Sequence, residues 1–398
     1  MLRRYFYHLG NAFIFLWITM FIVVFADSLS WPVVPYLIKE FLLEETAVVA
    51  ALGLLTSAFN LTKIAANILG AFLGDRANRS LIALLSLILL PISFTLLLFA
   101  ADHVWILVSY ILFGIFYGIF MPPINAMVAG LIPEELKGTL FGVFNLSWIL
   151  SQIPAPIVGG LLSKTISLRF PLRLSLVLSL VMLTLYITSR KTLRGLSPPN
   201  QPALAHKTRK TSNPPTRKLL LLCLAQFFSG LGNGVLSPIT AAFLIYVIGA
   251  SPLEMGLAYS IGWGLATALA QIPGGRLSDK LGYKPVMVIS TLVGSPPILL
   301  IPLFRGLEYF IVINALLCLS GNLALPAFSA YIAALMGERS LSRGFGLTSA
   351  SFSVGLIVGP IMGSFLWTIF QPNYLPPFAI STIFFLLTLP FIIALKSD

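Results

Sequence analysis

The chain has 398 residues, of which 58% are hydrophobic and only 10% are charged. Soluble domains average about 25% charged residues, so a soluble enzyme, a disordered chain and a disulfide scaffold are excluded. The sequence contains no phosphate-binding loop, and its histidines, His8, His103 and His206, are too scattered for a metal site. We therefore expect a membrane protein that is not an enzyme and that uses no cofactor and no metal.

Long stretches without charged residues predict twelve membrane-spanning helices. A helix needs about 20 mostly apolar residues to cross a bilayer, and continuous rather than alternating apolar runs exclude a β-barrel. The expected spans lie within residues 5–26, 46–74, 80–101, 104–133, 138–163, 174–189, 219–253, 255–275, 285–304, 309–337 and 344–395, of which the last holds two helices separated at 371–377.

The basic residues predict the orientation of these helices. If the N-terminus lies inside and the spans alternate, 19 of the 25 Lys and Arg residues lie inside, five lie outside, and Lys63 lies within a span. By the positive-inside rule both termini are cytoplasmic, in a multi-pass protein of the plasma membrane. The net charge of +12 then reports topology and contact with membrane lipid. Because no recognition motif accompanies the charge, we expect no nucleic-acid partner.

The second half of the chain repeats the first. Residues 190–218 are rich in Pro, Ser, Lys and Arg, which predicts a flexible cytoplasmic linker between residues 1–189 and 219–398. A shift of about 205 residues aligns Ala26-Asp27-Ser28 with Gly232-Asn233-Gly234, as it does several Pro and Gly positions further along. Two parallel six-helix repeats around a midplane site are typical of a rocking transporter.

The loops after the second and eighth expected spans carry one motif. Residues 275–284, GRLSDKLGYK, resemble at every fixed position the G-x-L-x-D-[RK]-x-G-x-[RK] signature of the major facilitator superfamily. The first copy has Ala71 and Asn78 in place of two glycines. Asn tolerates a left-handed turn best after Gly, so we expect that turn at Asn78 too. The resemblance implies an all-α membrane fold of twelve helices in two six-helix bundles, working as a monomer.

The resemblance also implies that charges of these loops hold the cytoplasmic side shut in the outward-open state. Carboxylates would meet the positive ends of helices, and basic residues would pair with neighbouring acids. The alternative is a set of ordinary solvated loop charges. The expected gate comprises Asp75, Arg76, Arg79, Glu134, Gly275, Asp279, Lys280, Gly282, Lys284 and Glu338.

The fifth and eleventh expected spans share a pattern of small residues and proline. It resembles the antiporter motif G-x8-G-x3-G-P-x2-G-G, with two glycines replaced in the fifth span. Small residues permit close helix approach and Pro permits a bend, so both an export gate and ordinary packing remain open. The Arg that drug antiporters usually carry in the fourth span is absent, with Gly114 at its position. The pattern comprises Gly142, Pro156, Gly159 and Gly160, and Gly355, Gly359, Pro360 and Gly363.

Two charged residues, Asp27 and Lys63, lie within the expected spans. Such residues are costly in a membrane and are candidates for function. Asp27 is the proton site, a contact for a cationic substrate group, or the partner of Lys63. The resemblance places the first, fourth, seventh and tenth helices around the substrate cavity. The remaining polar candidates for its lining are Tyr110, Gln226, Asn233, Asn314 and Asn322.

These features favour proton-coupled efflux of small amphiphilic compounds by alternating access, with protons as the coupling ion. A proton symporter or a uniporter for a small metabolite such as a sugar or organic anion is the alternative. From another class, a non-transporting receptor or assembly factor could share the same fold.

Overall fold

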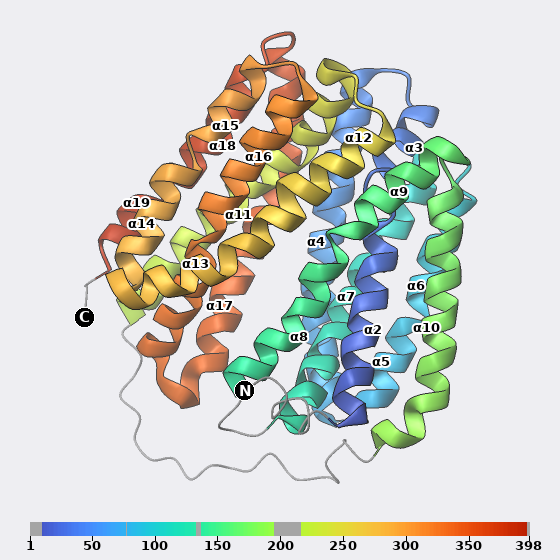
Figure 1. The fold of residues 1–398 in the computed structure, drawn as a ribbon, viewed down its shortest axis with the longest axis vertical. Coiled ribbons are helices and arrows are strands. Elements are labelled where there is room, and N and C mark those ends of the chain that lie inside the picture. Colours follow the sequence, from blue (N-terminus) through green and yellow to red (C-terminus); the bar gives the residue numbers. More distant parts are fainter. Residues whose placement is uncertain (1–9, 77, 133–136, 195–215, 396–398) are drawn as a thin grey trace. The chain divides into compact units, whose positions relative to one another are not determined.

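The computed structural model describes residues 10–76, 78–132, 137–194 and 216–395. Within these ranges the chain is helical and contains no strand (Figure 1). Eleven of the described helices are long and apolar enough to cross a membrane. Apolar runs of this length form helices because every backbone N–H and C=O group is then satisfied inside the segment. The expected all-α membrane fold is confirmed.

The first half contains the six expected spans, of which the third and fifth are each formed by two helices. The breaks lie near Ile88 in the third span and between Ser151 and Pro154 in the fifth. The helices are α2 (Asn11–Ser28), α3 (Val34–Phe41), α4 (Glu45–Arg76), α5 (Arg79–Leu87), α6 (Leu89–Leu98), α7 (His103–Leu131), α8 (Lys137–Ser151), α9 (Pro154–Thr165) and α10 (Phe170–Arg194).

In the second half the expected span 255–275 is a chain of three pieces, with the π-helix η3 between two α-helices. This segment begins at a capping box in which Ser251 and Glu254 satisfy each other's backbone N–H groups. The elements are α11 (Thr216–Ala242), η2 (Phe243–Ile248), α12 (Pro252–Leu257), η3 (Ala258–Leu265), α13 (Ala266–Leu281), α14 (Tyr283–Gly294), α15 (Pro297–Leu300), η4 (Ile301–Leu303), α16 (Leu307–Asn322), α17 (Ala324–Phe370), α18 (Leu375–Leu386) and α19 (Thr388–Ile393).

The described chain divides into two compact units. The first unit takes in residues 1–33 and 62–211, and the second takes in residues 34–61 and 212–398. Helix α4 therefore belongs to both, because its beginning packs with the second half of the sequence and its remainder with the first. Most of the expected linker, 190–218, lies outside the described residues.

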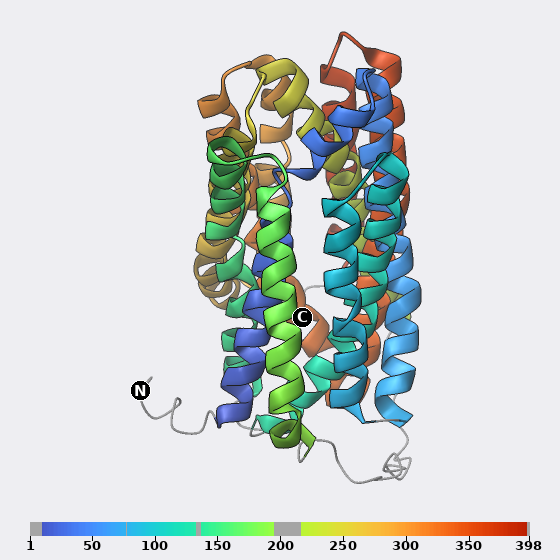
Figure 2. The same ribbon diagram turned by 90° about the vertical axis from the view of Figure 1, so that its right-hand side faces the viewer.

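In the first unit, α2 packs against α10, α8, α9 and α7, while α5 and α6 pack against α7. Figure 2 shows α10 running beside α2. Ser175 on α10 donates a 2.7 Å hydrogen bond to the carbonyl of Ala26 on α2. This polar contact joins the two helices one residue before Asp27.

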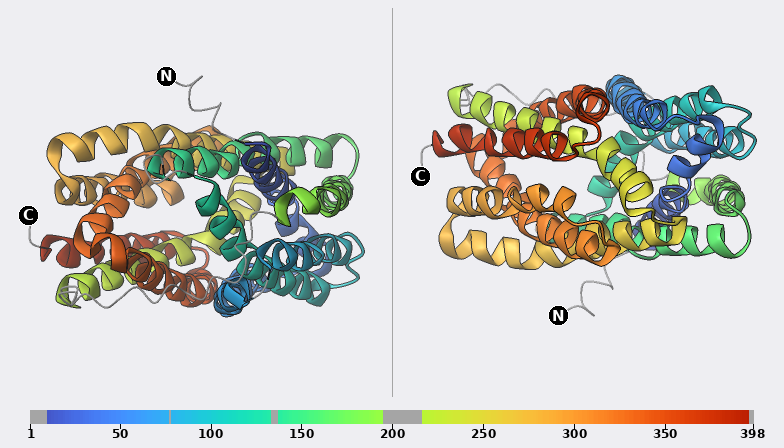
Figure 3. Two further views of the ribbon diagram at one scale, coloured as in Figure 1. Left: turned by 90° about the horizontal axis from the view of Figure 1, so that it is seen from below. Right: turned by 90° about the horizontal axis from the view of Figure 1, so that it is seen from above.

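In the second unit, α11 packs along α17 and α18, and Figure 3 shows the yellow-green ribbon of α11 beside the orange and red ribbons. Ser381 on α18 donates a 2.9 Å hydrogen bond to the carbonyl of Gly232 on α11. This bond repeats the one between Ser175 and Ala26, with the same separation of 149 residues along the chain. The repeat predicted from the sequence is thus reproduced in individual hydrogen bonds.

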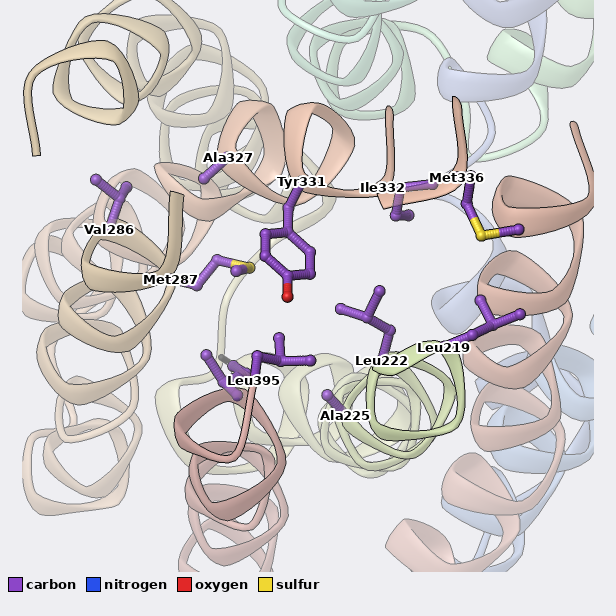
Figure 4. Packing of buried hydrophobic residues seen from close by; sticks show 11 residues of the cluster. Leu219, Leu222, Ala225, Val286, Met287, Ala327, Tyr331, Ile332, Met336 and Leu395 are labelled. Carbon is purple, nitrogen blue, oxygen red and sulfur yellow. The ribbon is translucent and has the colours of Figure 1, made fainter. Parts of the chain in front are cut away.

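A buried apolar cluster closes the second unit at the beginning of α11. The Tyr331 ring on α17 lies between Met287 on α14 and Leu222 on α11, and Leu219 lies further along α11 (Figure 4). The Tyr331 ring points between these helices toward Leu395. Four elements that are distant in sequence are held together here by apolar burial.

Candidate functional site

The charged residue of the first span, Asp27, has specific polar neighbours within the first unit. The Tyr117 hydroxyl of α7 donates a 3.0 Å hydrogen bond to Oδ2 of Asp27. The side chain of Trp31, one turn further along the chain, also lies within hydrogen-bonding range of the carboxylate. Lys63 on α4 interacts electrostatically with Asp27. The site thus combines a carboxylate, a phenol and an ammonium group from three helices.

Close backbone packing holds Asp27 in place. Gly159 on α9 lies against the carbonyl of Leu29, and a Cβ at Gly159 would lie only 2.2 Å from that oxygen. Together with the hydrogen bond from Ser175 to Ala26, this contact fixes the backbone on both sides of Asp27. Small residues serve this purpose in membrane helices because they let backbones approach.

Lys63 is placed by the packing of α4 on α7. A Cβ at Gly118 would lie 2.5 Å from the carbonyl oxygen of Lys63, so only glycine permits this approach. Thr62 adds a 3.3 Å hydrogen bond to the carbonyl of Ile111. Because Gly118 follows Tyr117 directly, one turn of α7 positions both the donor to Asp27 and the backbone of Lys63.

The second half has an amide where the first half has Asp27. Asn233 occupies the aligned position on α11, and its Nδ2 donates a 2.9 Å hydrogen bond to the carbonyl of Ser229. An amide does not titrate, so the pair of equivalent positions is chemically asymmetric. Any proton exchange at this pair rests on Asp27.

Two other polar candidates of the second half belong to one network on α16. Asn322 donates hydrogen bonds to Thr267 Oγ1 at 3.0 Å and to the carbonyl of Cys318 at 2.7 Å. Asn314, one turn before Cys318, is buried against Gly262 of the π-helix η3. These amides join α16 to η3 and α13.

The other two polar candidates do not join this network. Tyr110 packs edge-on against Phe113 at 6.0 Å between ring centroids. Gln226 is half-buried on α11, and in the described part of the chain its side chain has no hydrogen-bond partner.

The second copy of the loop signature is well defined. Gly282 has φ +87°, a conformation that favours glycine, and separates α13 from α14. Lys284 donates a 2.7 Å hydrogen bond to the carbonyl of Leu395 and so ties the start of α14 to the residues just beyond α19. Asp279 and Lys280 are exposed, and Gly275 has open space around its Cα. Lys284, the last residue of the motif, therefore has a defined structural contact.

In the first copy of the loop signature, the prediction of a left-handed turn at Asn78 is wrong. Asn78 has φ −63° and ψ 114°, and its side chain accepts a 3.1 Å hydrogen bond from the Leu81 N–H. An extended residue whose oxygen satisfies a free N–H group is an N-cap, which Asn favours as strongly as turns. Arg79 begins α5 and is half-buried. Four side chains of the expected gate lie outside the described residues: those of Asp75, Arg76, Glu134 and Glu338.

The pattern of small residues and proline marks close packing in both halves. Gly355 approaches the backbone of Gly230, Gly359 approaches Gly234, and Gly363 approaches Val235, so that α17 lies directly on α11. The first copy differs in two ways. Its helix is interrupted just before Pro154, whereas α17 continues through Pro360, and Gly142 has open space around it. Pro156 and Gly160 are buried on α9.

Sequence reasoning missed two residues of the site, Tyr117 and Trp31. Trp31 carried a signal, because a spacing of four residues from Asp27 would place the two side chains on one face of a helix, although α2 itself ends at Ser28. Tyr117 lies two helical turns beyond Tyr110, a residue that repeat alignment did select. No local pattern indicates that it is Tyr117 that meets Asp27, since the contact depends on how α2 and α7 pack.

The two-fold helical repeat, the loop signature and an intramembrane carboxylate are together typical of a membrane transporter. The family model described as Major Facilitator Superfamily matches residues 16–221 and 222–397. The chain therefore belongs to the major facilitator superfamily, as its loop signature predicted.

Its curated relatives include drug-resistance proteins. The chain is 26% identical to multidrug resistance protein MdtG of Proteus mirabilis over 366 residues, which cover 88% of this chain and 87% of that protein. It is 24% identical to quinolone resistance protein NorA of Staphylococcus aureus over 361 residues, with 89% of each chain covered. Multi-drug resistance efflux pump PmrA of Streptococcus pneumoniae is 23% identical over 367 residues, with 87% of each covered.

Solved structures share the fold at lower identity. A bacterial homolog of the human lysosomal transporter Spinster, in an inward-facing and occupied conformation, superposes with a TM-score of 0.75 at 18% identity, covering 97% of this chain and 96% of that one. The human organic anion transporter MFSD10 gives a TM-score of 0.70 at 18% identity, covering 95% and 98%. The families and neighbours that match are transporters.

Proposed function

We propose that this protein is a proton-coupled antiporter that exports small amphiphilic compounds across the plasma membrane. The observation that carries the proposal is Asp27, a carboxylate within a membrane span that accepts a hydrogen bond from Tyr117 and feels the charge of Lys63. Intramembrane carboxylates are costly and mark proton relays or substrate sites. The resemblance to MdtG, NorA and PmrA, whose names refer to drug resistance or efflux, supports export.

In this proposal Asp27 alternates between a charged and a protonated form. The charged form is stabilised by the Tyr117 donor and by the positive charge of Lys63. Protonation removes the attraction to Lys63 and weakens the hydrogen bond, because charge-assisted bonds are about twice as strong as neutral ones. The two forms therefore favour different packings of α2, α4 and α7, which is the linkage that alternating access requires.

The division of the chain supports a rocking mechanism. Helix α4 is continuous, yet its first part belongs to one compact unit and its remainder to the other. In the internal repeat of the sequence, residues 34–61 are part of the first half. If the two repeats are to rock, residues 34–61 have to separate from the helices of the second half. The excess of Lys and Arg on one side orients the protein with both termini in the cytoplasm.

The test is substrate-triggered proton movement in everted membrane vesicles. A panel of cationic, neutral and anionic aromatic compounds is added after a pH gradient has been formed, and proton efflux is followed with a fluorescent dye. We expect at least one compound to dissipate the gradient with the wild-type protein and none to do so with Asp27→Asn. Asp102→Asn is the matched control, because Asp102 caps α7 outside the spans and Asn caps equally well.

Two outcomes would overturn the proposal. One is that no compound moves protons although the folded protein is abundant in the membrane. The other is that Asp27→Asn exchanges protons for substrate as well as the wild type does.

A second candidate, facilitated uniport, is favoured by one observation: Lys63 already compensates the charge of Asp27. A uniporter would equilibrate its substrate without moving protons, and its flux would be unchanged by a protonophore. Antiport would be abolished by that protonophore. The same vesicles therefore separate the two mechanisms.

A further inference from the structure

A polar patch in the second unit combines two amide side chains with an exposed indole ring. Asn322, near the middle of the apolar span Leu307–Met336, donates a 3.0 Å hydrogen bond to Oγ1 of Thr267 on α13. Gln271, one turn after Thr267 on the same helix, donates a 3.3 Å hydrogen bond to the Thr267 carbonyl. Both amide groups therefore contact one residue of α13, which packs against α16 (Figure 1).

Close backbone packing of α13 on α16 sets this arrangement. A Cβ at Gly274 would lie 2.6 Å from the carbonyl oxygen of Leu323, so glycine permits the approach of the two backbones. Leu323 directly follows Asn322, and Gly274 lies two turns after Thr267. The approach therefore holds the Asn322 amide beside α13.

Each amide uses its nitrogen within the protein and leaves its oxygen free. The Nδ2 of Asn322 also donates a 2.7 Å hydrogen bond to the Cys318 carbonyl. An amide oxygen in place of either nitrogen would face a carbonyl oxygen without a hydrogen between them, so both orientations are fixed. Within the described part of the chain, neither Oδ1 of Asn322 nor Oε1 of Gln271 has a hydrogen-bond partner, and neither atom is fully buried.

These two oxygens call for a donor from outside the protein. Hydrocarbon offers no hydrogen-bond donor, so an amide oxygen that faces lipid without a partner is costly. The patch therefore borders a space that water or a donor-bearing ligand enters. Asn322 uses both of its N–H groups in the protein, so toward a ligand it acts only as an acceptor.

Trp263 adds an aromatic surface to the patch. It lies in η3, four residues before Thr267, so the two side chains share a face of the segment, and 43% of the Trp263 surface is exposed. Four residues correspond to about 6 Å of helix rise, a distance that an aromatic ring with a short amine chain covers. Indole rings stack on other aromatic rings and attract cations over their faces.

The internal repeat gives this patch a counterpart in the first half. The shift of 204 residues that superposes the two copies of the loop signature also places Lys63 on Thr267 and Gly118 on Asn322. Gly118 lies against the Lys63 backbone, as Asn322 lies against Thr267. Equivalent helices thus meet at equivalent residues, but the first half carries a charge there and the second half carries uncharged acceptors.

We propose that Trp263, Gln271 and Asn322 form a binding site for an aromatic compound that carries N–H donors, such as a primary arylalkylamine. The indole stacks on the ring of the ligand, and the two amide oxygens accept hydrogen bonds from its nitrogen. The site selects for donors rather than for charge. That the bound compound is one that the protein exports rests on the proposed function, whereas the site itself does not.

The experiment compares two probes with the same ring and the same charge. Naphthylethylamine carries N–H donors, and its trimethylammonium analogue carries none. Binding of each to the purified protein in lipid nanodiscs is measured by equilibrium dialysis at neutral pH, and uptake by empty nanodiscs is subtracted. Because hydrogen bonds that involve a charged group are strong, we expect the wild-type protein to bind naphthylethylamine more tightly by roughly tenfold or more.

The variants separate the two parts of the site. Gln271→Met and Asn322→Leu each remove an acceptor, so the preference for naphthylethylamine falls several-fold while binding of the trimethylammonium analogue is unchanged. Gln271→Glu keeps the acceptor oxygens and retains the preference. Trp263→Leu weakens both probes several-fold and equally. Trp105→Leu is the matched control, because Trp105 is also exposed but lies at the start of α7 in the first unit.

Unfolding midpoints show whether each variant is folded. Gln271→Met is the decisive variant, because in the described structure Gln271 makes a single hydrogen bond, at 3.3 Å, to a backbone carbonyl. The proposal is overturned if neither probe binds saturably to the wild type, if the wild type binds both equally, or if Gln271→Met keeps the full preference.

These results are independent of the proton-antiport experiment, since no gradient and no flux are involved. A protein that shows the preference but moves no protons would retain this site and lose the antiport proposal. Proton-coupled flux of other compounds, without any preference between the two probes, would have the opposite meaning.

Discussion

The Tyr117 hydroxyl and the Asp27 carboxylate form a 3.0 Å hydrogen bond between α7 and α2. The two residues lie 90 positions apart in the sequence, in the fourth and first spans. In a medium without water, this bond and the nearby Lys63 charge decide which packing of these helices the ionised carboxylate favours. Any change of protonation at Asp27 therefore directly alters its hydrogen bond with Tyr117 on α7.

Tyr117→Phe tests this coupling. The variant removes the donor and keeps the ring, which packs on Phe116 at 4.9 Å between centroids. Because hydrogen bonds to charged groups contribute about 1.5–3 kcal/mol, we expect a loss of proton-linked transport of roughly tenfold or more with a normal folded yield. The measurement is substrate-triggered proton flux in vesicles. Tyr309→Phe on α16 is the control, because Tyr309 is exposed and its ring keeps its stacking on Phe304. Wild-type flux from Tyr117→Phe would contradict the prediction.

Gly159→Ala is expected to destabilise the first unit. The added Cβ would lie 2.2 Å from the Leu29 carbonyl, so α9 and α2 have to separate. Overpacking of this kind typically costs about 1–3 kcal/mol. Thermal unfolding in detergent measures the effect as a lowered midpoint. Gly142→Ala, in the same sequence pattern but with open space around it, should unfold like the wild type. Equal midpoints for the two variants would show that α9 and α2 are not packed this closely.

Gly282→Ala is expected to disturb the loop between α13 and α14. With φ +87° and ψ 162°, Gly282 adopts a conformation that costs other residues about 1–3 kcal/mol. We expect a lower unfolding midpoint and a reduced transport rate, because the strain falls two residues before Lys284 and its contact with Leu395. Gly275→Ala serves as the control in the same motif, since nothing lies within 4 Å of its added Cβ. A Gly282→Ala protein as stable as Gly275→Ala would refute the assignment.

Tyr36→Phe should change the response of the protein to alkali. Tyr36 lies on α3, outside the candidate membrane spans, and burial raises the pKa of its phenol, with Tyr259 and Glu254 adding to the shift. The folded phenol thus keeps its proton where the unfolded phenol, with a pKa of about 10, loses it. Its contribution to stability is complete below that pH and declines as the pH rises further. Unfolding midpoints from neutral pH to about pH 11 should show a shallower alkaline decline in Tyr36→Phe than in wild type. Parallel pH curves would contradict the prediction.

Much of the architecture was readable from local features. Stretches without charge located the spans, because a segment in lipid has to be apolar and helical. The eighth span was expected as one helix, and the structure divides it around the π-helix η3, which no hydropathy pattern distinguishes from an α-helix. At Asn78 the sequence predicts a left-handed turn, whereas in the structure the Asn78 side chain caps α5. Asn satisfies both roles, so its identity cannot choose between them.

The candidate site was readable only in part. A charge inside an apolar run is conspicuous in any sequence, and Asp27 and Lys63 were found on that ground. Tyr117 was not, because a tyrosine in an aromatic-rich span carries no sign of its partner. Glu45 was also missed, since it lies at the edge of a span where acidic residues are common. Its side chain accepts hydrogen bonds from Trp367 and Gln371, which lie more than 300 residues away.

Composition, hydropathy and repetition established a membrane transporter of two six-helix repeats, because these properties depend on each segment's own transfer into lipid. The pairing of Asp27 with Tyr117, and of Glu45 with Trp367, followed from how the helices pack. So did the inclusion of residues 34–61 in the second unit rather than in the half to which they belong by repeat. Lipid solvates all apolar helix faces alike, so hydropathy does not say which faces meet. That choice rests on small residues and buried hydrogen bonds between distant segments.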